Sequence, residues 1–309
     1  MIKYVAVAAA LKAFSVCPQS KALYRAIGNT VGSRRRTRRG LPKSRIRRAR
    51  RLLDLLEKHN AIHDSARLLE VGTGWIHWES VFLRLFYDVD VTLYDVWDNR
   101  QLEPLKRYFA ELDRLIDEEV AIDPRRHQRV HGLLRSISSV DSFSDLYSVL
   151  GFDYVVDTSG TLDCLPDESF DVVFSCNVLE HVAAAILPGF VQSFSRLLPP
   201  GGYSVHSIDM GDHLSYYDRR VSAKNYLTYS DSVWKRLFEN EVQYFNRVQR
   251  SGWLSLFRNA EFQLMHEDSA FIDLGTIAVA KRYEYLSRRD RDCIGLTVLH
   301  RKAPSLRGI

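Results

Sequence analysis

Two glycines that follow a short apolar run constrain the fold of this chain more than any other feature. The stretch RLLEVGTGWIHWES covers residues 67–80, and in it the apolar run meets Gly72 and Gly74. Such a run is typical of a buried strand, and the glycines allow the backbone to approach a ligand closely. The third glycine of a dinucleotide-binding turn is missing, because bulky residues occupy positions 76–78. The turn therefore suits a different cofactor.

Apolar strands alternate with helical segments along most of the chain. We expect strands at 67–71, 89–96, 152–158, 171–176, 203–208 and 262–268, and a seventh at either 276–282 or 295–302. We expect helices at 46–59, from the glycine turn to about Tyr87, at 101–120, near 142–149, at 184–198 and from Ser232 to about Ala260, with IDPRRH (122–127) as a loop. This alternation predicts an α/β fold with a mostly parallel sheet that helices cover on both faces.

The N-terminal part has a different character. Residues 1–30 predict short helices broken near Pro18 and Gly28, and residues 31–44 predict a basic linker. We divide the chain into this helical extension and linker (1–62) and an α/β domain (63–309), with insertions at about 101–150 and 210–260. The first residues resemble a secretion signal, but Lys12 interrupts their apolar part and no A-x-A-like cleavage site follows. An amphipathic helix is the preferred interpretation, and no apolar run reaches the roughly 18 residues of a membrane-spanning helix.

The four cysteines, at positions 17, 164, 176 and 293, stand far apart. They form no C-x-x-C pair and no Cys/His cluster with metal-ligand spacing, so we expect no metal site. Cys164 and Cys176 lie in apolar sequence and are expected in the core. This cysteine usage fits a reducing, cytoplasmic location.

Positive charge is concentrated in one segment, residues 34–51. It holds ten Arg and one Lys and no acid, and the rest of the chain has 32 basic and 38 acidic residues. Such a run suits an anionic partner, which could be nucleic acid, an acidic membrane surface at the periphery, or an anionic substrate. A solvated linker and helix start is the alternative. The segment has no aromatic residue for base stacking, which disfavours nucleic acid.

Four features fall at the carboxyl ends of the predicted strands, where doubly wound sheets bind ligands. The glycine turn is the first, and Asp95, 25 residues after Glu70, is the second. The others are TLDCLPDESFD at 161–171 and CNVLEHV at 176–182. Each feature alone is a weak signal, but their order and spacing together are specific.

In LLEVGTG, LYD, LPDESFDVVFS, VLEHV and LLPPGG, the chain resembles the class I S-adenosylmethionine-dependent methyltransferases over about residues 65–210. The resemblance implies a Rossmann-like, doubly wound, seven-stranded sheet and S-adenosylmethionine as cofactor. This cofactor has no diphosphate, which explains the missing third glycine. The motif GTGW, the insertion at 101–150 and the tyrosine-rich segment after residue 210 resemble a bacterial subgroup linked to glycan or secondary-product modification.

The resemblance also implies which residues bind the cofactor. Glu70 would interact with the amino-acid end, directly or through water, and Asp95 with the ribose hydroxyls. The acid that often contacts the adenine falls on Thr161 here, so Asp157, Asp163 or the backbone N–H of Leu162 could replace it. The cofactor-binding residues are therefore expected to be Glu70, Gly72, Thr73, Gly74, Asp95, Thr161, Leu162 and Asn177. The turn Leu179-Glu180-His181 would line the methionine side with Asn177.

The acceptor side offers a candidate base and a set of aromatic and polar groups. His213 follows the fifth strand by a few residues and is the candidate base, with Asp209 or Asp212 as an orienting or alternative acid. His206 lies within the strand and is expected in the core. Aromatic faces and planar hydrogen-bonding groups suit a sugar or other polar ring, and the candidate substrate-binding residues are Tyr216, Tyr217, Asn246 and Arg247. A tyrosine-rich cap that fills its own core is the alternative.

Three functions compete. The first is O-methylation of a sugar, glycan or small polar metabolite, and the second is RNA methylation that uses the arginine run. The third is a non-catalytic cofactor-fold protein that acts as a binding partner. An RNA enzyme would be expected to carry a motif such as N-P-P-Y after the fourth strand, where this chain has C-N-V-L. The sequence does not indicate the oligomeric state.

The ribose assignment predicts that Asp95→Ala weakens S-adenosylmethionine binding by roughly 1–3 kcal/mol, because charged hydrogen bonds are lost. Calorimetry with this cofactor measures the change, and titration with NAD in parallel tests the cofactor class. Unchanged affinity in the variant would contradict the ribose assignment.

Overall fold

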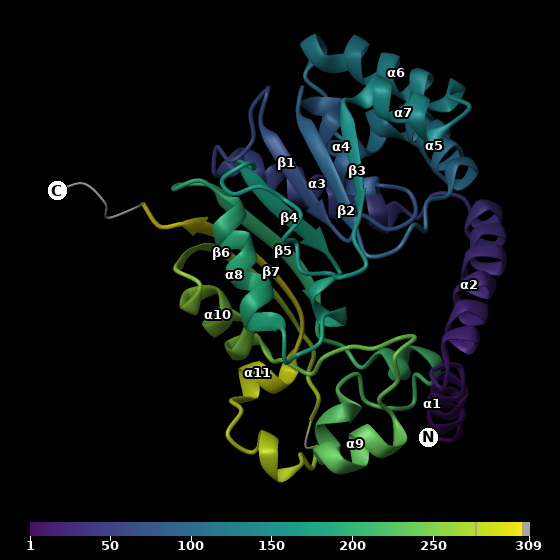
Figure 1. The fold of residues 1–309 in the computed structure, drawn as a ribbon, viewed down its shortest axis with the longest axis vertical. Coiled ribbons are helices and arrows are strands. Elements are labelled where there is room, and N and C mark those ends of the chain that lie inside the picture. Colours follow the sequence, from purple (N-terminus) through teal and green to yellow (C-terminus); the bar gives the residue numbers. More distant parts are fainter. Residues whose placement is uncertain (276, 305–309) are drawn as a thin grey trace. The chain divides into compact units, whose positions relative to one another are not determined.

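The structure, a computed structural model, describes residues 1–275 and 277–304. Seven strands form one sheet in the order β3-β2-β1-β4-β5-β7-β6 (Figure 1). The strands are β1 (Arg67–Val71), β2 (Asp90–Asp95), β3 (Phe152–Val156), β4 (Val172–Cys176), β5 (Tyr203–Asp209), β6 (Phe262–Phe271) and β7 (Cys293–Lys302). The order reverses between β1 and β4, which is the pattern of a doubly wound sheet. The predicted Rossmann-like fold class is therefore confirmed.

The helices alternate with these strands, as expected. They are α1 (Ile2–Phe14), α2 (Pro18–Arg39), α3 (Lys43–Lys58), α4 (Trp78–Phe86), α5 (Leu102–Glu119), α6 (Pro124–Ser139), α7 (Phe143–Leu150), α8 (Leu187–Leu197), α9 (Asp231–Leu237), α10 (Arg250–Asn259) and α11 (Arg288–Asp292). Short 3-10 turns are η1 (Leu179–His181), η2 (His213–Tyr217), η3 (Asn225–Thr228) and η4 (Lys281–Tyr283).

The chain forms two compact units. Unit 1 contains residues 1–27, 176–195 and 205–303. Unit 2 contains residues 28–175 and 196–204 together with Pro304. The boundary predicted at residue 62 stays a prediction.

In unit 2, β1 lies between two parallel neighbours. Leu68 and Leu69 are fully buried, since both faces of the strand are covered. Val71 lies opposite Tyr94 of β2, and Asp95 lies opposite Val156 of β3. This register brings the carboxyl ends of β1, β2 and β3 to the same edge of the sheet.

Trp78, one of the bulky residues that follow the glycine turn, packs in the core of unit 2. Its side chain is 1% exposed and stacks on Phe109 of α5, with ring centroids 4.8 Å apart. Its indole N–H donates to the carbonyl oxygen of Arg45 in α3 over 3.0 Å. Trp78 therefore joins α3, α4 and α5 in the core of unit 2.

The predicted loop at 122–127 is wrong, because α6 begins within it at Pro124. Asp123 caps this helix by accepting a hydrogen bond of 2.9 Å from the backbone N–H of Arg125, and proline suits the first helical position. Val130, Leu134 and Ile137 then bury one face of the helix. Figure 1 shows α5, α6 and α7 grouped beside α4 in unit 2.

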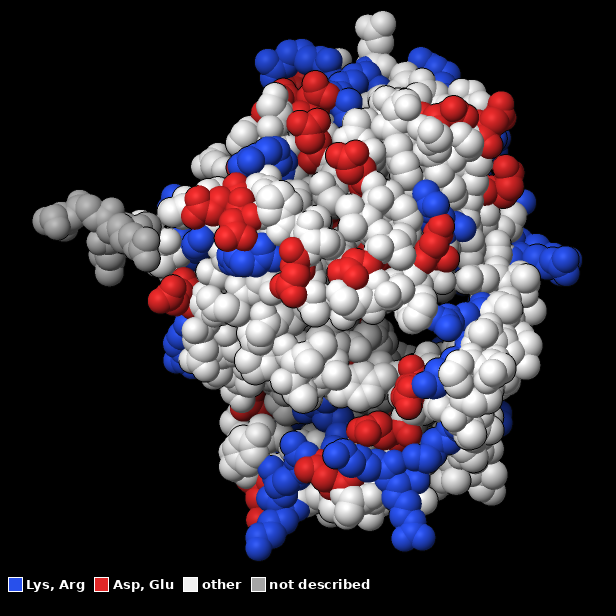
Figure 2. All heavy atoms as spheres, in the orientation of Figure 1, with Lys and Arg blue, Asp and Glu red and all other residues white. Residues whose placement is uncertain are grey.

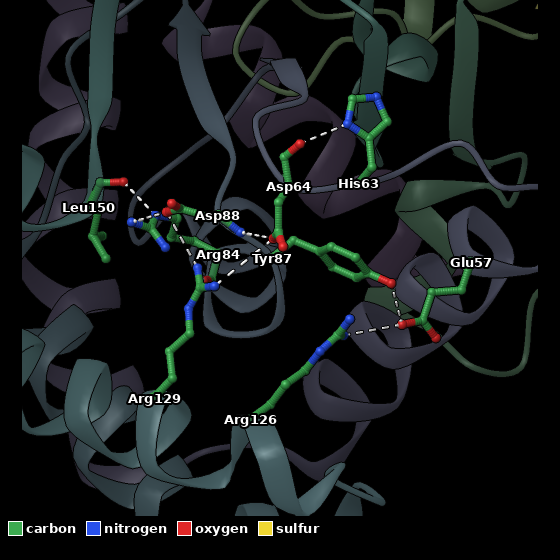
Figure 3. Close-up of polar contacts among 9 residues, drawn as sticks. All are labelled: Glu57, His63, Asp64, Arg84, Tyr87, Asp88, Arg126, Arg129 and Leu150. Atoms are coloured by element: carbon green, nitrogen blue, oxygen red, sulfur yellow. Dashed lines mark hydrogen bonds and ion pairs between the residues drawn. The ribbon is translucent and has the colours of Figure 1, made fainter.

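Ion pairs also hold α6 in unit 2 (Figure 3). Arg84 of α4 and Arg129 of α6 both approach the carboxylate of Asp88, at 2.7 and 3.5 Å. Arg126 lies 3.6 Å from Glu57 of α3. Exposed ion pairs contribute only about 0–1 kcal/mol each. The buried apolar face of α6 therefore attaches the helix, and the ion pairs set its orientation.

The basic linker predicted at 31–44 is also wrong. Helix α2 begins at Pro18, as expected, but it continues through Gly28 to Arg39. Arginine is a good helix former, and one interior glycine costs only about 1 kcal/mol, so the helix continues. In α1, Tyr4, Ala8 and Leu11 are buried in an aromatic cluster of unit 1 with Trp234 and Phe245.

The long helix predicted from Ser232 to Ala260 is instead two helices, α9 and α10, separated by residues 238–249. Phe238 and Phe245 in the connection are buried in the same aromatic cluster. The side-chain oxygens of Asn240 and Asn246 accept hydrogen bonds from the backbone N–H groups of Gln243 and Val248 in this connection, which competes with helix formation.

The second alternative for the last strand is confirmed, since β7 spans 293–302 and pairs antiparallel with β6. Residues 277–280 are not a strand, and Thr276 lies outside the described residues. Cys164 is exposed, which corrects its expected place in the core. Among the described residues, no helix is long and apolar enough to cross a membrane.

The packing of Trp78 predicts that Trp78→Ala lowers the free energy of unfolding by about 3–5 kcal/mol, because a large cavity replaces the indole. Trp97→Ala, whose ring is 46% exposed, is the control and should cost much less. Chemical denaturation measures both, and equal losses would contradict a central role for Trp78.

Candidate functional site

The glycine turn after β1 has the conformation that only glycine adopts without strain. Gly72 and Gly74 have φ values of 73° and 66°. The backbone N–H of Gly72 donates to the carbonyl oxygen of Tyr94 over 2.8 Å, so the turn is attached to the end of β2. A Cβ atom at Gly74 would meet nothing within 4 Å, which leaves open space beside its backbone.

Glu70 lies at the end of β1 and is 2% exposed. Its carboxylate accepts hydrogen bonds from the hydroxyl of Thr73, over 3.2 Å, and from the hydroxyl of Ser80 in α4. Burial raises the pKa of Glu70, and the nearby carboxylate of Glu79 raises it further. Glu70 therefore fixes the turn against α4, and its contact with a cofactor stays a prediction.

His77 extends this network, a role that the sequence analysis missed. Its Nδ1 lies 2.6 Å from the hydroxyl of Thr73, and its Nε2 lies 3.0 Å from the hydroxyl of Tyr147 in α7. Burial lowers the pKa of His77 to about 3, and the charge of Arg100 contributes, so the ring is neutral. Only the fold brings Tyr147 to this ring, so no sequence pattern near His77 indicates the contact.

Asp95 at the end of β2 is hydrogen-bonded to the glycine turn after β1, so the two predicted cofactor-binding features of unit 2 are joined. One carboxylate oxygen accepts a hydrogen bond of 2.9 Å from the backbone N–H of Gly74, and the other accepts one of 2.8 Å from Val96. Burial raises the pKa of Asp95. The backbone N–H of Trp97 also donates to this carboxylate over 3.4 Å. A carboxylate has about four acceptor positions, so about one remains for a hydroxyl group of a ligand.

The predicted adenine-side residues follow β3. The hydroxyl of Thr161 is exposed and lies 3.1 Å from that of Ser159. Leu162 is buried with a φ of 66°, and its backbone N–H lies near the hydroxyl of Tyr94 and partly offsets the raised pKa of that tyrosine. Asp157 is occupied by Ser159 and Tyr94, at 2.6 and 3.2 Å.

Asn177 and the turn η1 belong to unit 1. Asn177 is exposed with a φ of 56°, and its backbone N–H donates to the carbonyl oxygen of Ser207 over 2.8 Å. Asn246 holds the turn that follows, since its side-chain amide donates to the carbonyl oxygens of Leu179 and Val182 over 2.8 and 3.0 Å. The donor group of Asn246 is thus occupied, and its predicted contact with a substrate stays a prediction.

His213 begins η2, and its surroundings include the predicted acids. Its Nε2 lies 3.6 Å from a carboxylate oxygen of Asp209, which also accepts a hydrogen bond from the hydroxyl of Tyr216. Burial acts to raise the pKa of Asp209, but His213 and Tyr216 lower it below the ordinary value. Asp212 is fully buried and accepts a bond of 2.7 Å from Tyr4, and burial raises its pKa to about 6. His206 is fully buried, as expected.

Two groups of described residues could hold a metal ion, although the sequence predicted none. Glu180, His181 and His213 in unit 1 place their ligand atoms within 4.8 Å of one another. The group of Asp117, His127 and His131 does the same in unit 2. No local spacing in the sequence indicates either group, because the first joins Glu180 and His181 to a residue 32 positions after His181 and the second joins two helices.

Arg247 lines a cavity of about 610 Å³ in unit 1. The Arg247 side chain is 10% exposed and pairs with Asp231 at 2.5 Å, while its Nη1 makes no hydrogen bond within the described chain. Figure 2 shows Lys and Arg side chains around α9, with acidic groups between them. Tyr216 and Tyr217 are 58% and 46% exposed. Arg247, Tyr216 and Tyr217 could contact a polar acceptor.

Comparison with known proteins gives the class. A family model described as a methyltransferase domain matches residues 42–267. The chain therefore belongs to the methyltransferase-domain family. No protein of curated function matches it.

Several solved structures are similar at low identity. One, described as a sarcosine dimethylglycine methyltransferase of Galdieria sulphuraria, is 12% identical, with a TM-score of 0.48 and 84% and 86% of the two chains covered. The 1,6-didemethyltoxoflavin-N1-methyltransferase of Burkholderia thailandensis, solved with S-adenosylhomocysteine, is 15% identical, with a TM-score of 0.43 and coverage of 82% and 78%. Phosphoethanolamine N-methyltransferase 2 of Haemonchus contortus, solved with S-adenosyl-L-methionine, is 13% identical, with a TM-score of 0.46 and coverage of 81% and 52%.

Asp212 gives a testable pH dependence. Its pKa is about 6 in the folded chain and about 3.9 in an unfolded one, so its stabilising contribution is complete below about pH 4 and is lost as the pH rises through 6. From pH 4 to pH 7 the loss is expected to be about 2–3 kcal/mol, and Asp212→Asn should remove it.

Chemical denaturation of wild type and variant at pH 4, 5, 6 and 7 measures this effect as a difference in slope. The lowered pKa of Asp209 acts in the opposite sense and is common to both proteins, so it cancels. Parallel stability profiles would refute the shifted pKa.

Proposed function

We propose that this methyltransferase transfers a methyl group from S-adenosylmethionine to a hydroxyl of a sugar, glycan or small polar metabolite. The hydrogen bond between Asp95 and Gly74 carries the cofactor part of the proposal, because it places an acid and an open glycine turn at one edge of the sheet. The acceptor part is supported by His213 and by the tyrosine and arginine side chains of unit 1.

The residues of unit 2 fit this cofactor. The open space beside Gly74 accommodates a ligand close to the backbone, and Asp95 can accept a hydrogen bond from a ribose hydroxyl. The third glycine of a dinucleotide site would fall on position 77, where this chain has the fully buried His77. When bound, S-adenosylmethionine supplies a methyl carbon that bonds to the acceptor oxygen while the sulfur keeps the electron pair of the broken S–C bond. In unit 2, Glu70, Thr73, Thr161 and Leu162 complete the proposed set of cofactor-binding residues. In unit 1, Asn177 is the residue that we propose for this role.

The role that we propose for His213 is to assist loss of the acceptor hydroxyl's proton. A sulfonium is already a good leaving group, so the protein mainly supplies alignment and handles this proton. The carboxylate of Asp209 lies 3.6 Å from Nε2 of His213, which is too far for a hydrogen bond, so it would act on the ring through its charge. Tyr216, Tyr217 and Arg247 would contact the acceptor, with Arg247 suited to a carboxylate or phosphate group.

RNA is the alternative acceptor, and the exposed arginines of α2 and α3 favour it. Several arginines of the run, however, have structural partners. The guanidinium of Arg36 lies 3.4 Å from the centre of the Trp75 ring, and Arg48 pairs with Glu79 at 2.5 Å. We therefore prefer a small polar acceptor, and RNA binding with steep salt dependence would reverse this preference.

The proposal predicts that His213→Gln lowers kcat by about 10²–10⁴-fold, the usual contribution of a group that handles a proton. Production of S-adenosylhomocysteine with a panel of sugars and hydroxylated metabolites measures the rate. Calorimetry should give an unchanged cofactor affinity.

His266→Gln on β6 is the matched control and should retain full activity. Equal activity of the His213→Gln variant and wild type would exclude the role of His213, and absence of methyl transfer to every hydroxyl compound would exclude the proposed acceptor class.

A further inference from the structure

We propose that Glu180, His181 and His213 bind one divalent transition-metal ion. Their ligand atoms lie within 4.8 Å of one another, so a single cation can reach all three. All three residues belong to unit 1, where two come from the turn η1 and the third from the start of η2.

The ligand set defines the class of cation. Two imidazoles and one carboxylate suit Zn²⁺, Co²⁺, Fe²⁺ or Mn²⁺, whereas Mg²⁺ and Ca²⁺ prefer oxygen ligands. Three protein ligands leave at least one coordination position for water or another oxygen ligand. Such an arrangement is typical of a metal site that acts on a substrate.

The turn that carries Glu180 and His181 is held firmly. The side chain of Asn246 donates to the carbonyl oxygens on both sides of these two residues, and its backbone N–H donates to the carbonyl oxygen of Glu180 over 2.6 Å. Glu180 is 2% exposed. A metal ligand is most effective when its orientation is fixed in advance, and these bonds supply that orientation.

The hydrogen bond of His181 leaves the correct nitrogen for a metal. Its Nδ1 lies 2.6 Å from the carbonyl oxygen of Tyr244 and must donate, because a carbonyl oxygen only accepts. In the neutral ring, Nε2 then carries the lone pair that a cation needs. Bonds of this kind orient most histidine ligands in metalloproteins.

His213 brings its ring to the same place from the start of η2. The side chain is 13% exposed, and its ring packs against those of His181 and Phe245, with centroids 5.1 and 4.6 Å away. Its Nε2 is buried and makes no hydrogen bond within the described residues. The carboxylate of Asp209, 3.6 Å from this nitrogen, adds negative charge beside the three ligands.

The use of this cation rests on the proposed function. A bound divalent cation lowers the pKa of a hydroxyl that coordinates it, so His213 would assist proton loss through the metal. The binding of the metal itself does not depend on the acceptor, and the two can be tested separately.

Titration of the chelator-treated full chain with Co²⁺ tests the site, because the visible absorption of Co²⁺ reports imidazole coordination. We expect His213→Ala and Glu180→Gln each to weaken Co²⁺ binding by about 100-fold or more, since even supporting residues around a metal contribute about 10–100-fold. Zn²⁺ should compete with Co²⁺, and Mg²⁺ in similar amounts should not.

His127→Ala is the matched control, because it removes a ligand of the second group, with Asp117 and His131. This variant should keep the binding that the other two lose. Wild-type affinity in both His213→Ala and Glu180→Gln, or a loss confined to His127→Ala, would overturn the proposal.

Circular dichroism of each metal-free variant checks its fold, and Glu180→Gln decides the matter if His213→Ala does not fold. The methyl-transfer assay is read independently. Co²⁺ binding without methyl transfer would count against the proposed function alone, and methyl transfer without Co²⁺ binding against the metal site alone.

Discussion

The parallel pairing of β1 with β2 fixes where the chain can bind a ligand. Since Val71 lies opposite Tyr94, the glycine turn and Asp95 emerge at the same edge of the sheet and are joined by a hydrogen bond of 2.9 Å. A shift of one residue in this register would turn the buried side chains of β1 to the opposite face. The cofactor residues of unit 2 therefore depend on the apolar packing of the strand that precedes them.

A second set of constraints shapes the turn η1 in unit 1. The side-chain amide of Asn246 donates its hydrogen bonds to this turn. The neighbouring Phe245 is buried in the aromatic cluster with Trp234 and Tyr226. The side chains that could act on an acceptor are thus held by a core of large rings. Rigid support of this kind is what a reaction based on alignment requires.

Local sequence signals predicted much of the fold, and particular residues show where they stopped. The run 67–71 is a strand with the predicted bounds, because its apolar residues are buried on both faces. Asp123 and Pro124 are a clear helix start, yet the many charged residues after them hid the buried face of α6. The segment 238–249 has helical composition, but burial of Phe238 and Phe245 and the hydrogen bonds of asparagine side chains outweigh helix propensity.

The sequence by itself determined the alternation of strands and helices, the glycine turn and the family, because these depend on residues close together in the chain. Only the tertiary structure decided which side chains meet across long separations. The ring of His77 hydrogen-bonds to Tyr147, which lies 70 residues further along the chain, and the ring of His181 lies beside that of His213. No local pattern encodes such contacts, because they form only when packing brings distant turns together. The metal site that we propose depends on a contact of this kind.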